Sequence, residues 1–191
     1  MNVLERSKPI ALGSLVAIAL SLVCFWVIGD FITAANVDGN DNNIALMDDC
    51  LPGDPGWDDT GGCGLKKHQG DVPTEEFGEL LTSPLTIPPN GSLIGHPSWR
   101  NEPSHITIKA GKTVHVTNRG GRGHTFTEVA EFGGGFVGDL NIGLNPAPEC
   151  TPQSTTVLAP GAKDKLTGLD PGLRKFQCCI HPWMRATIRV E

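Results

Sequence analysis

Apolar and polar residues alternate over short stretches in the C-terminal half of the chain. Ile106 and Ile108 alternate in this way, and so do Val114 and Val116 a few positions later. A period of two residues is that of a half-buried strand. The 191-residue chain also contains 24 Gly and 15 Pro, which suits many tight loops and few long helices. This pattern predicts an all-β protein, an antiparallel sandwich.

The two alternating stretches are predicted to form a hairpin-like unit, because a short turn around Gly111 joins them. The segment from Glu131 to Pro152 lacks the alternation and is long for a connection in a sandwich, so we interpret it as an insertion. A short helix is expected over 74–81. Further short strands, each bounded by Gly or Pro, are expected at 125–129, 154–158, 163–166, 173–178 and 186–190.

Residues 10–29 form an uncharged apolar run, IALGSLVAIALSLVCFWVIG. A helix of this length crosses the roughly 30 Å hydrocarbon core of a bilayer. Arg6 and Lys8 precede the run and acidic residues follow it, so the positive-inside rule places the rest of the chain outside the cytoplasm. A cleaved signal peptide is the alternative, since residues 33–35 (TAA) offer a small-residue cleavage site. Both interpretations predict an extracytoplasmic protein, in the periplasm or at the cell surface.

The remainder of the chain divides by charge. From Asp30 to Thr82 twelve acidic residues stand against two lysines, whereas from Ser83 to Glu191 eleven Lys and Arg stand against eight acids. Neither part has the dense basic stripe of a nucleic-acid binder, so no nucleic-acid partner is expected. The predicted organisation is a membrane anchor or signal peptide at 1–35, an acidic, partly flexible leader at 36–82 and a folded domain at 83–191.

Six cysteines suit an oxidising compartment. Cys24 lies within the apolar run. Cys50 and Cys63 flank a loop rich in Pro, Gly and Asp that has no visible core of its own, so a disulfide between them is predicted. The three remaining cysteines include an odd thiol, which needs another use.

Three residues that can bind metals stand at equal spacing near the C-terminus. In FQCCIHPWM, His181 follows Cys178 by three positions and Met184 follows His181 by three. A thiolate, an imidazole and a thioether on one loop between two strands can converge on one ion, and this soft ligand set selects copper. A second imidazole would complete a plane of two His and one Cys with a weak axial Met. His124 is the best candidate, because it ends the Gly-rich GGRG bend at the start of a predicted strand.

These motifs resemble those of the cupredoxins, in particular the plastocyanin, amicyanin and pseudoazurin group. VHVTNRGGRGHTF is similar to the family's strand, Asn, loop and first His ligand, and FQCCIHPWM is similar to its Cys, His and Met loop. The resemblance covers roughly residues 94–191. It implies one copper ion at His124, Cys178, His181 and Met184, a Greek-key β-sandwich, and outer-sphere electron transfer without a bound substrate.

The resemblance also carries expectations about function. The chain is expected to be a type 1, or blue, copper protein that carries single electrons and is not an enzyme. Redox partner proteins are expected to dock transiently near His181 and Trp183, and an uncleaved N-terminal segment would add the membrane as a partner. Thr125 and Asn118 are expected to hydrogen-bond between the two ligand loops and hold Cys178 in place.

Cys179 competes with Cys178 for the role of ligand. It lies only two positions before His181, which is too short for the family's loop, and Cys178 shares an inward strand face with Phe176. Cys178 is therefore the expected ligand. Cys179 would face away, and we expect it to form a disulfide with Cys150 that ties the insertion to the copper loop.

Two other functions compete with electron transfer. A copper storage or delivery protein could use the same site. An enzyme such as a nitrite reductase or a multicopper oxidase would need further copper sites rich in His, and the chain has six His and no His-x-His pair. The enzyme is therefore the less favoured of the two alternatives.

Overall fold

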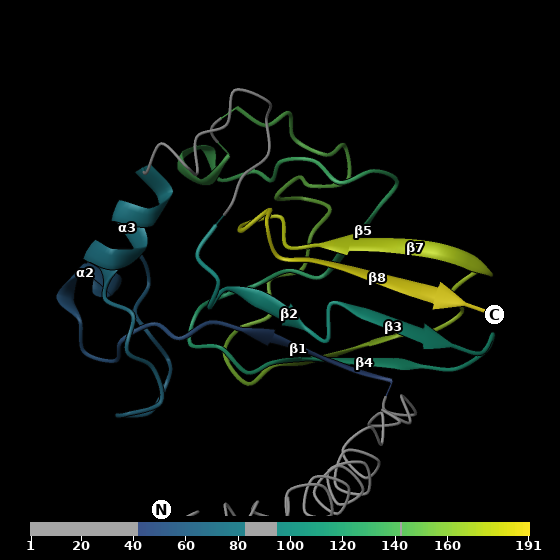
Figure 1. The fold of residues 1–191 in the computed structure, drawn as a ribbon, viewed down its shortest axis with the longest axis horizontal. Helices are drawn as coiled ribbons and strands as arrows, with labels where there is room; N and C mark the ends of the chain where they lie inside the picture. The colour runs from purple at the N-terminus through teal and green to yellow at the C-terminus, as the bar shows by residue number, and fades with distance from the viewer. Residues whose placement is uncertain (1–41, 83–94, 142) are drawn as a thin grey trace, which may run out of the picture. The chain divides into compact units, whose positions relative to one another are not determined.

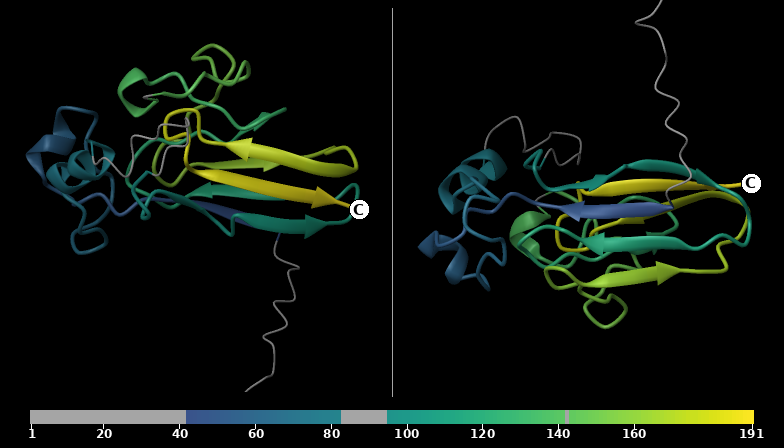
Figure 2. Two further views of the ribbon diagram at one scale, coloured as in Figure 1. Left: turned by 45° about the horizontal axis from the view of Figure 1, so that its top comes forward. Right: turned by 90° about the horizontal axis from the view of Figure 1, so that it is seen from below.

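The structure is a computed structural model that describes residues 42–82, 95–141 and 143–191. The expected anchor or signal segment at 1–35 lies outside these residues. Within the part that is described, no helix combines the length and the apolar character needed to cross a bilayer. Two four-stranded sheets form the centre of this part, and they lie against each other as two layers (Figures 1 and 2).

The first sheet has the strand order β2-β1-β4-β6. Val114 and Val116 are fully buried, whereas His115 between them is exposed, as the alternation predicts. The central position of β4 brings the Gly-rich bend that follows it close to the core. The strands are β1 (Asn43–Met47), β2 (Arg100–Glu102), β4 (Val114–Asn118) and β6 (Lys163–Leu166).

The second sheet has the order β3-β8-β7-β5. β7 and β8 form an antiparallel pair in which Gln177 lies opposite Arg185, so the predicted ligand loop joins their ends. Phe126 and Phe176 stack with ring centroids 4.8 Å apart and help to fill the space between the sheets. The strands are β3 (His105–Ile108), β5 (Thr127–Val129), β7 (Gly172–Gln177) and β8 (Arg185–Val190).

The predicted hairpin at Gly111 is wrong, and the sandwich is not purely antiparallel. β3 and β4 belong to different sheets, so the turn between them carries the chain from one layer to the other. β3 pairs in parallel with β8, and β1 pairs in parallel with β4. Alternation shows only that one face of a strand is buried, and strands in opposite layers bury their faces in the same core. The strand expected at 154–158 is reduced to one bridge, between Leu158 and His124.

The first strand of the sandwich lies in the segment expected to be a leader. β1 is hydrogen-bonded to both β2 and β4, and its Ile44 and Leu46 are buried in the core. The compact unit that contains the sheets accordingly includes residues 39–191, so the boundary expected at Ser83 does not separate the leader from the fold. The acidic composition around β1 concealed a strand of only five residues.

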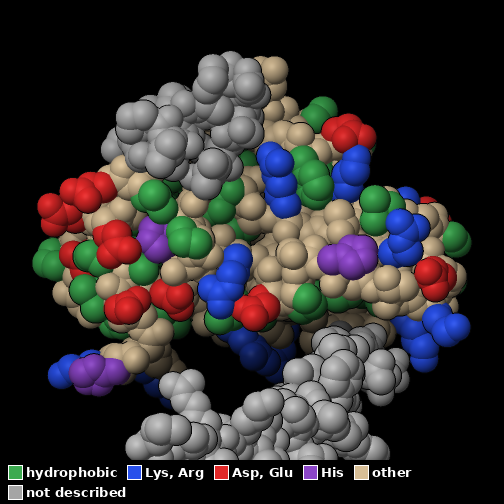
Figure 3. Space-filling model, in the orientation of Figure 1, with side chains coloured by type: hydrophobic (Ala, Val, Ile, Leu, Met, Phe, Trp, Pro, Cys, Tyr) green, Lys and Arg blue, Asp and Glu red, His purple; other side chains and the backbone are tan. Residues whose placement is uncertain are grey.

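The segment between β1 and β2 contains two helices and the predicted disulfide between Cys50 and Cys63. The helices are α2 (Pro55–Asp58) and α3 (Thr74–Thr82), the second at its predicted place. The loop closed by the disulfide does have a core: Trp57 is buried and lies 5.2 Å from Phe77 and 5.6 Å from Trp99, measured between ring centroids. Acidic side chains gather over the end of the molecule that carries these helices (Figure 3).

Candidate metal centre

His124 projects from a backbone that hydrogen bonds fix on both sides. Its N–H donates to the Leu158 carbonyl at 3.2 Å, and the Leu158 N–H donates back at 2.7 Å. The side-chain amide of Asn118 donates to the carbonyls of Leu158 and Arg122 at 2.8 and 2.7 Å. The His124 side chain is fully buried. The Gly-rich bend therefore fixes the position of one imidazole, that of His124, within the core.

Cys178 follows β7 directly, and the chain returns to β8 in a tight turn. The Met184 N–H donates to the His181 carbonyl at 2.9 Å, and the Cys178 N–H donates to the Met184 carbonyl at 3.0 Å. The sulfur of Cys178 accepts N–H groups from Thr125 at 3.3 Å and from His181 at 3.4 Å. Of the cysteines that the structure describes, Cys178 alone is outside a disulfide.

The structure brings His124, Cys178 and His181 together as sequence analysis expects. Their ligand atoms lie within 4.8 Å of one another. The Cys178 sulfur is 4.0 Å from Nδ1 of His124 and 3.7 Å from Nδ1 of His181. With metal bonds of roughly 2.0 Å to nitrogen and 2.3 Å to sulfur, trigonal angles require a separation of about 3.7 Å between those atoms. The three side chains therefore fit a trigonal His₂Cys site, and their donor set is one that copper prefers.

Thr125 connects the two ligand loops, which agrees with its expected role. Its backbone N–H donates to the Cys178 sulfur, and its hydroxyl accepts the Cys179 N–H at 2.7 Å. Asn118 differs from the expectation, because its side chain bonds to Leu158, Arg122 and Gly120 on the His124 side only. Asn118 thus shapes one loop, and Thr125 joins the two.

The expected disulfide between Cys150 and Cys179 is present. It attaches the irregular 131–152 segment to the residue next to Cys178. Gly135 lies so close to Cys179 that a Cβ atom at position 135 would collide with the Cys179 carbonyl. The Phe136 N–H donates a hydrogen bond to the same carbonyl at 2.9 Å. The insertion therefore supports the back of the ligand loop.

Met184, the expected axial ligand, is buried in the core with 1% of its surface exposed. Its backbone closes the loop that carries Cys178 and His181. Ligation by Met184 stays a prediction.

Comparisons with known proteins found similarities among solved structures alone. No protein-family model matches the sequence, and no curated protein sequence matches it. Among solved structures, the chain is similar to a purple cupredoxin from Nitrosopumilus maritimus, with 20% identity, a TM-score of 0.39, and coverage of 54% of this chain and 94% of that one. It is also similar to amicyanin, in a reduced Cu(I) form of a proline-to-glycine mutant at pH 4, with 25% identity, a TM-score of 0.34, and coverage of 48% and 73%. The fit of the site to copper rests on the geometry of the three side chains themselves.

The charges within this site differ between its two histidines. Burial lowers the pKa of His124, but hydrogen bonds to Asp48 and Cys178 and the negative charges of both outweigh it and raise that pKa to about 9. Burial lowers the pKa of His181 below its usual value. Burial also opposes ionisation of Cys178, yet the hydrogen bonds and positive charges of the two histidines hold the pKa of its thiol well below the usual range. The cysteine is thus poised as the thiolate that binds metal.

Asp48 contacts His124, and the sequence patterns did not predict it as a residue of the site. Its carboxylate accepts a hydrogen bond from Nε2 of His124 at 2.7 Å, and both side chains are fully buried. Asp48 directly follows the Ile44 and Leu46 alternation of β1, which is the signal that could have placed it beside β4. A buried aspartate is unusual enough to require a partner.

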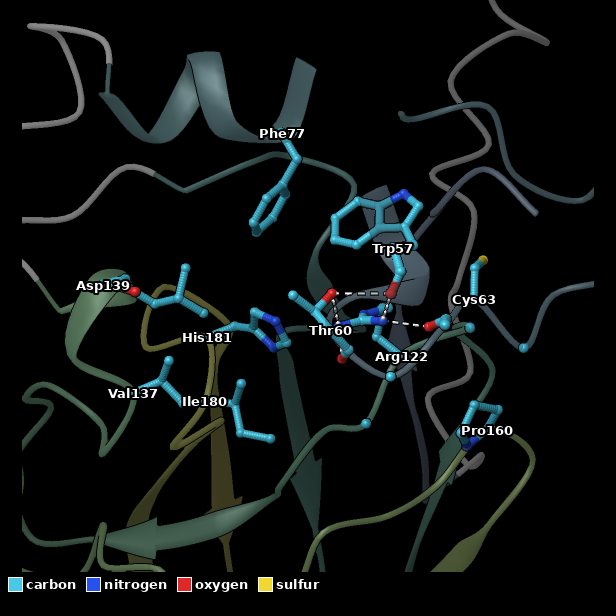
Figure 4. Close-up of a pocket in the computed structure, with 16 residues that line it drawn as sticks. Trp57, Thr60, Cys63, Phe77, Arg122, Val137, Asp139, Pro160, Ile180 and His181 are labelled. Atoms are coloured by element: carbon cyan, nitrogen blue, oxygen red, sulfur yellow. Dashed lines mark hydrogen bonds between the residues drawn. The ribbon is translucent and has the colours of Figure 1, made fainter. Parts of the chain in front are cut away.

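His181 borders a pocket of about 760 Å³ (Figure 4). The pocket wall is largely apolar and includes Trp57, Phe77, Leu140 and Ile180. His181 retains 5% exposure, whereas His124 has none. Of the two histidines, His181 is therefore the one that is accessible through this pocket. Trp183 lies beside His181, with ring centroids 5.5 Å apart, and packs against Gly95, where a Cβ atom would collide with its ring.

Proposed function

We propose that this protein is a type 1 copper protein that carries single electrons. The observation that carries the proposal is the buried cluster of two imidazole Nδ1 atoms and one thiolate around a common point. His124, Cys178 and His181 would hold one copper ion, with Met184 as the weak axial ligand. Copper bound in this way supplies a one-electron couple between Cu⁺ and Cu²⁺.

The protein's contribution is to fix the ligands in advance. The Cys178 sulfur accepts two backbone N–H groups. The backbone of His124 is hydrogen-bonded to Leu158 at 3.2 and 2.7 Å, and the His181 carbonyl accepts the Met184 N–H within its own loop at 2.9 Å. Ligands held by hydrogen bonds move little when the charge of the centre changes, which lowers the barrier to electron transfer. Thr125 holds the two ligand loops together when the charge of the centre changes.

His181 is the proposed point of electron entry and exit. Its ring faces the apolar pocket, so a redox partner protein that docks there would approach within a short distance of the centre. Such encounters are small and transient. We further propose that the protein works outside the cytoplasm, anchored by its N-terminal segment or released after its cleavage; its two disulfides support an oxidising compartment.

Copper storage or delivery with the same residues is the competing function. Delivery requires that ligands exchange readily with an acceptor, whereas here His124 and Cys178 are fully buried and His181 is 5% exposed. Burial of all three therefore favours the electron carrier.

The experiment that separates the two functions uses the full-length chain loaded with copper. An electron carrier should show an intense thiolate-to-Cu²⁺ absorption band that disappears on reduction and returns on oxidation over repeated cycles, and should release Cu⁺ to a chelator slowly. Rapid release to the chelator, together with loss of the band after one cycle, would support delivery instead.

A further inference from the structure

Asp48 is a buried carboxylate at the end of β1 whose two oxygens each accept two hydrogen bonds. Oδ1 accepts the N–H groups of Gly121 at 2.9 Å and Cys50 at 3.3 Å. Oδ2 accepts the N–H of Arg122 at 2.9 Å and Nε2 of His124 at 2.7 Å. Three of the four partners of the buried carboxyl group are backbone N–H donors, so none of these three can accept a proton from a carboxylic acid. This arrangement holds Asp48 as an anion inside the fold.

The backbone around Asp48 is shaped to receive this carboxylate. β1 runs parallel to β4, and the N–H groups of Arg119 and Gly120 donate to the Leu46 carbonyl at 2.8 and 3.0 Å. A Cβ atom at Gly120 would collide with Oδ2 of Asp48, so only glycine lets the bend close over the carboxylate. The bend that positions His124 is thus wrapped around the side chain of Asp48.

The hydrogen bond to Asp48 determines which nitrogen of His124 faces the cluster. An ionised carboxylate only accepts hydrogen bonds, so Nε2 of His124 must donate and carries the proton. Nδ1, on the side of the Cys178 sulfur, is then the nitrogen that offers its lone pair to a metal. A carboxylate in this position orients a metal-binding histidine and increases its basicity.

We infer that Asp48 is a positioning residue of the metal centre, which fixes His124 with Nδ1 toward the metal and favours Cu²⁺ over Cu⁺ through its negative charge. This inference rests on the proposed copper function. A buried negative charge stabilises a divalent ion more than a monovalent one, so Asp48 lowers the reduction potential of the centre. It also means that the acidic N-terminal segment supplies part of the copper site, through β1.

The test compares Asp48→Asn with the unaltered full-length chain. Dissociation constants for Cu²⁺ and Cu⁺ are measured by competition with chelators, and the reduction potential by redox titration. Loss of a partner of this kind weakens metal binding by about 10- to 100-fold. We expect that loss mainly for Cu²⁺, so the potential should rise by about 59 mV for each tenfold change in the ratio of the two affinities. A purely structural role would lower stability and leave that ratio unchanged.

Asp54→Asn is the matched control. Asp54 belongs to the same acidic segment and accepts hydrogen bonds from Thr74 and Gly56, but these lie away from His124. Its variant should lose stability and keep the potential of the unaltered chain. If the unaltered chain binds copper and Asp48→Asn has the same affinity ratio, the inference about Asp48 is wrong while the copper function stands. If the unaltered chain does not bind copper, both fail.

A second measurement covers the case in which Asp48→Asn does not fold. Nitrogen-15 NMR of the unaltered Cu⁺ protein should show a proton on Nε2 of His124 that is shifted strongly downfield and exchanges slowly with water. That result supports the inference. Rapid exchange of this proton, or a shift typical of an imidazole without a hydrogen bond, overturns it.

Discussion

The two histidines of the site have opposite surroundings. His124 is fully buried, is bonded to a carboxylate and has a pKa raised to about 9, whereas His181 borders an apolar pocket and has a lowered pKa. The two predicted ligand loops therefore differ in role. The Gly-rich bend holds a buried histidine against a carboxylate, and the C-terminal loop carries the histidine that borders the pocket.

The largest effect is expected at the cysteine that both histidines share. Cys178→Ser should abolish the thiolate absorption band, because an alcohol replaces the sulfur that both Nδ1 atoms face. Cys179→Ser should keep the band, although loss of its disulfide should lower the free energy of unfolding by about 2–5 kcal/mol. Visible spectra of both copper-loaded variants check this. The reverse pattern would identify Cys179 as the ligand.

The second prediction removes each imidazole in turn. His181→Gly leaves a gap that adjoins the pocket, so added imidazole should enter and restore a copper absorption band. His124→Gly leaves a gap enclosed by the fold next to Asp48, so the same imidazole should restore little. Titration of both copper-loaded variants with imidazole measures the contrast. Equal restoration would show that the two histidines are equally accessible.

The third prediction concerns the protons that copper displaces. Near pH 7 the raised pKa of His124 favours its protonated form, the lowered pKa of His181 favours the neutral imidazole, and the lowered pKa of Cys178 favours the thiolate. Binding of copper should therefore release about one proton per ion, from Nδ1 of His124. The release should fall toward zero as the pH rises through about 9, the pKa of His124. Calorimetry in buffers of different ionisation enthalpy counts these protons; a release of two near pH 7 would contradict the assignment.

The smallest effect is expected at the link between the loops. Thr125→Val removes the hydroxyl that accepts the Cys179 N–H, while the backbone N–H that bonds to the Cys178 sulfur remains. A buried N–H without a partner costs about 1–3 kcal/mol in the free energy of unfolding. Denaturant unfolding measures that cost. The position of the absorption band should hardly change, and a large shift would mean that Thr125 acts on the metal and not on the loops alone.

Sequence analysis predicted the C-terminal loop better than the rest of the site. Cys178 and His181 are three positions apart, so the loop alone brings them together, and the alternation around them identified β7 and β8. His124 could be proposed because it follows a Gly-rich bend next to a strand. Local spacing thus carried most of the information about the predicted ligands.

The contribution of β1 could not be seen in the same way. Asp48 meets His124 only because β1 pairs in parallel with β4, a contact between residues more than 70 positions apart that leaves no local pattern. The acidic residues around β1 pointed to a solvated leader. The composition of that segment reflects its many exposed acidic residues, so it does not identify the few buried positions, Ile44, Leu46 and Asp48.

Two imidazoles and one thiolate from distant parts of the chain are proposed to bind the same copper ion. X-ray absorption at the copper edge, on the full-length chain loaded with one equivalent of Cu²⁺, tests this proposal. We expect one short copper–sulfur bond and two nitrogen ligands with the scattering pattern of imidazole. A coordination shell of oxygen and nitrogen without sulfur, in folded protein whose Cys178 is reduced, would contradict it.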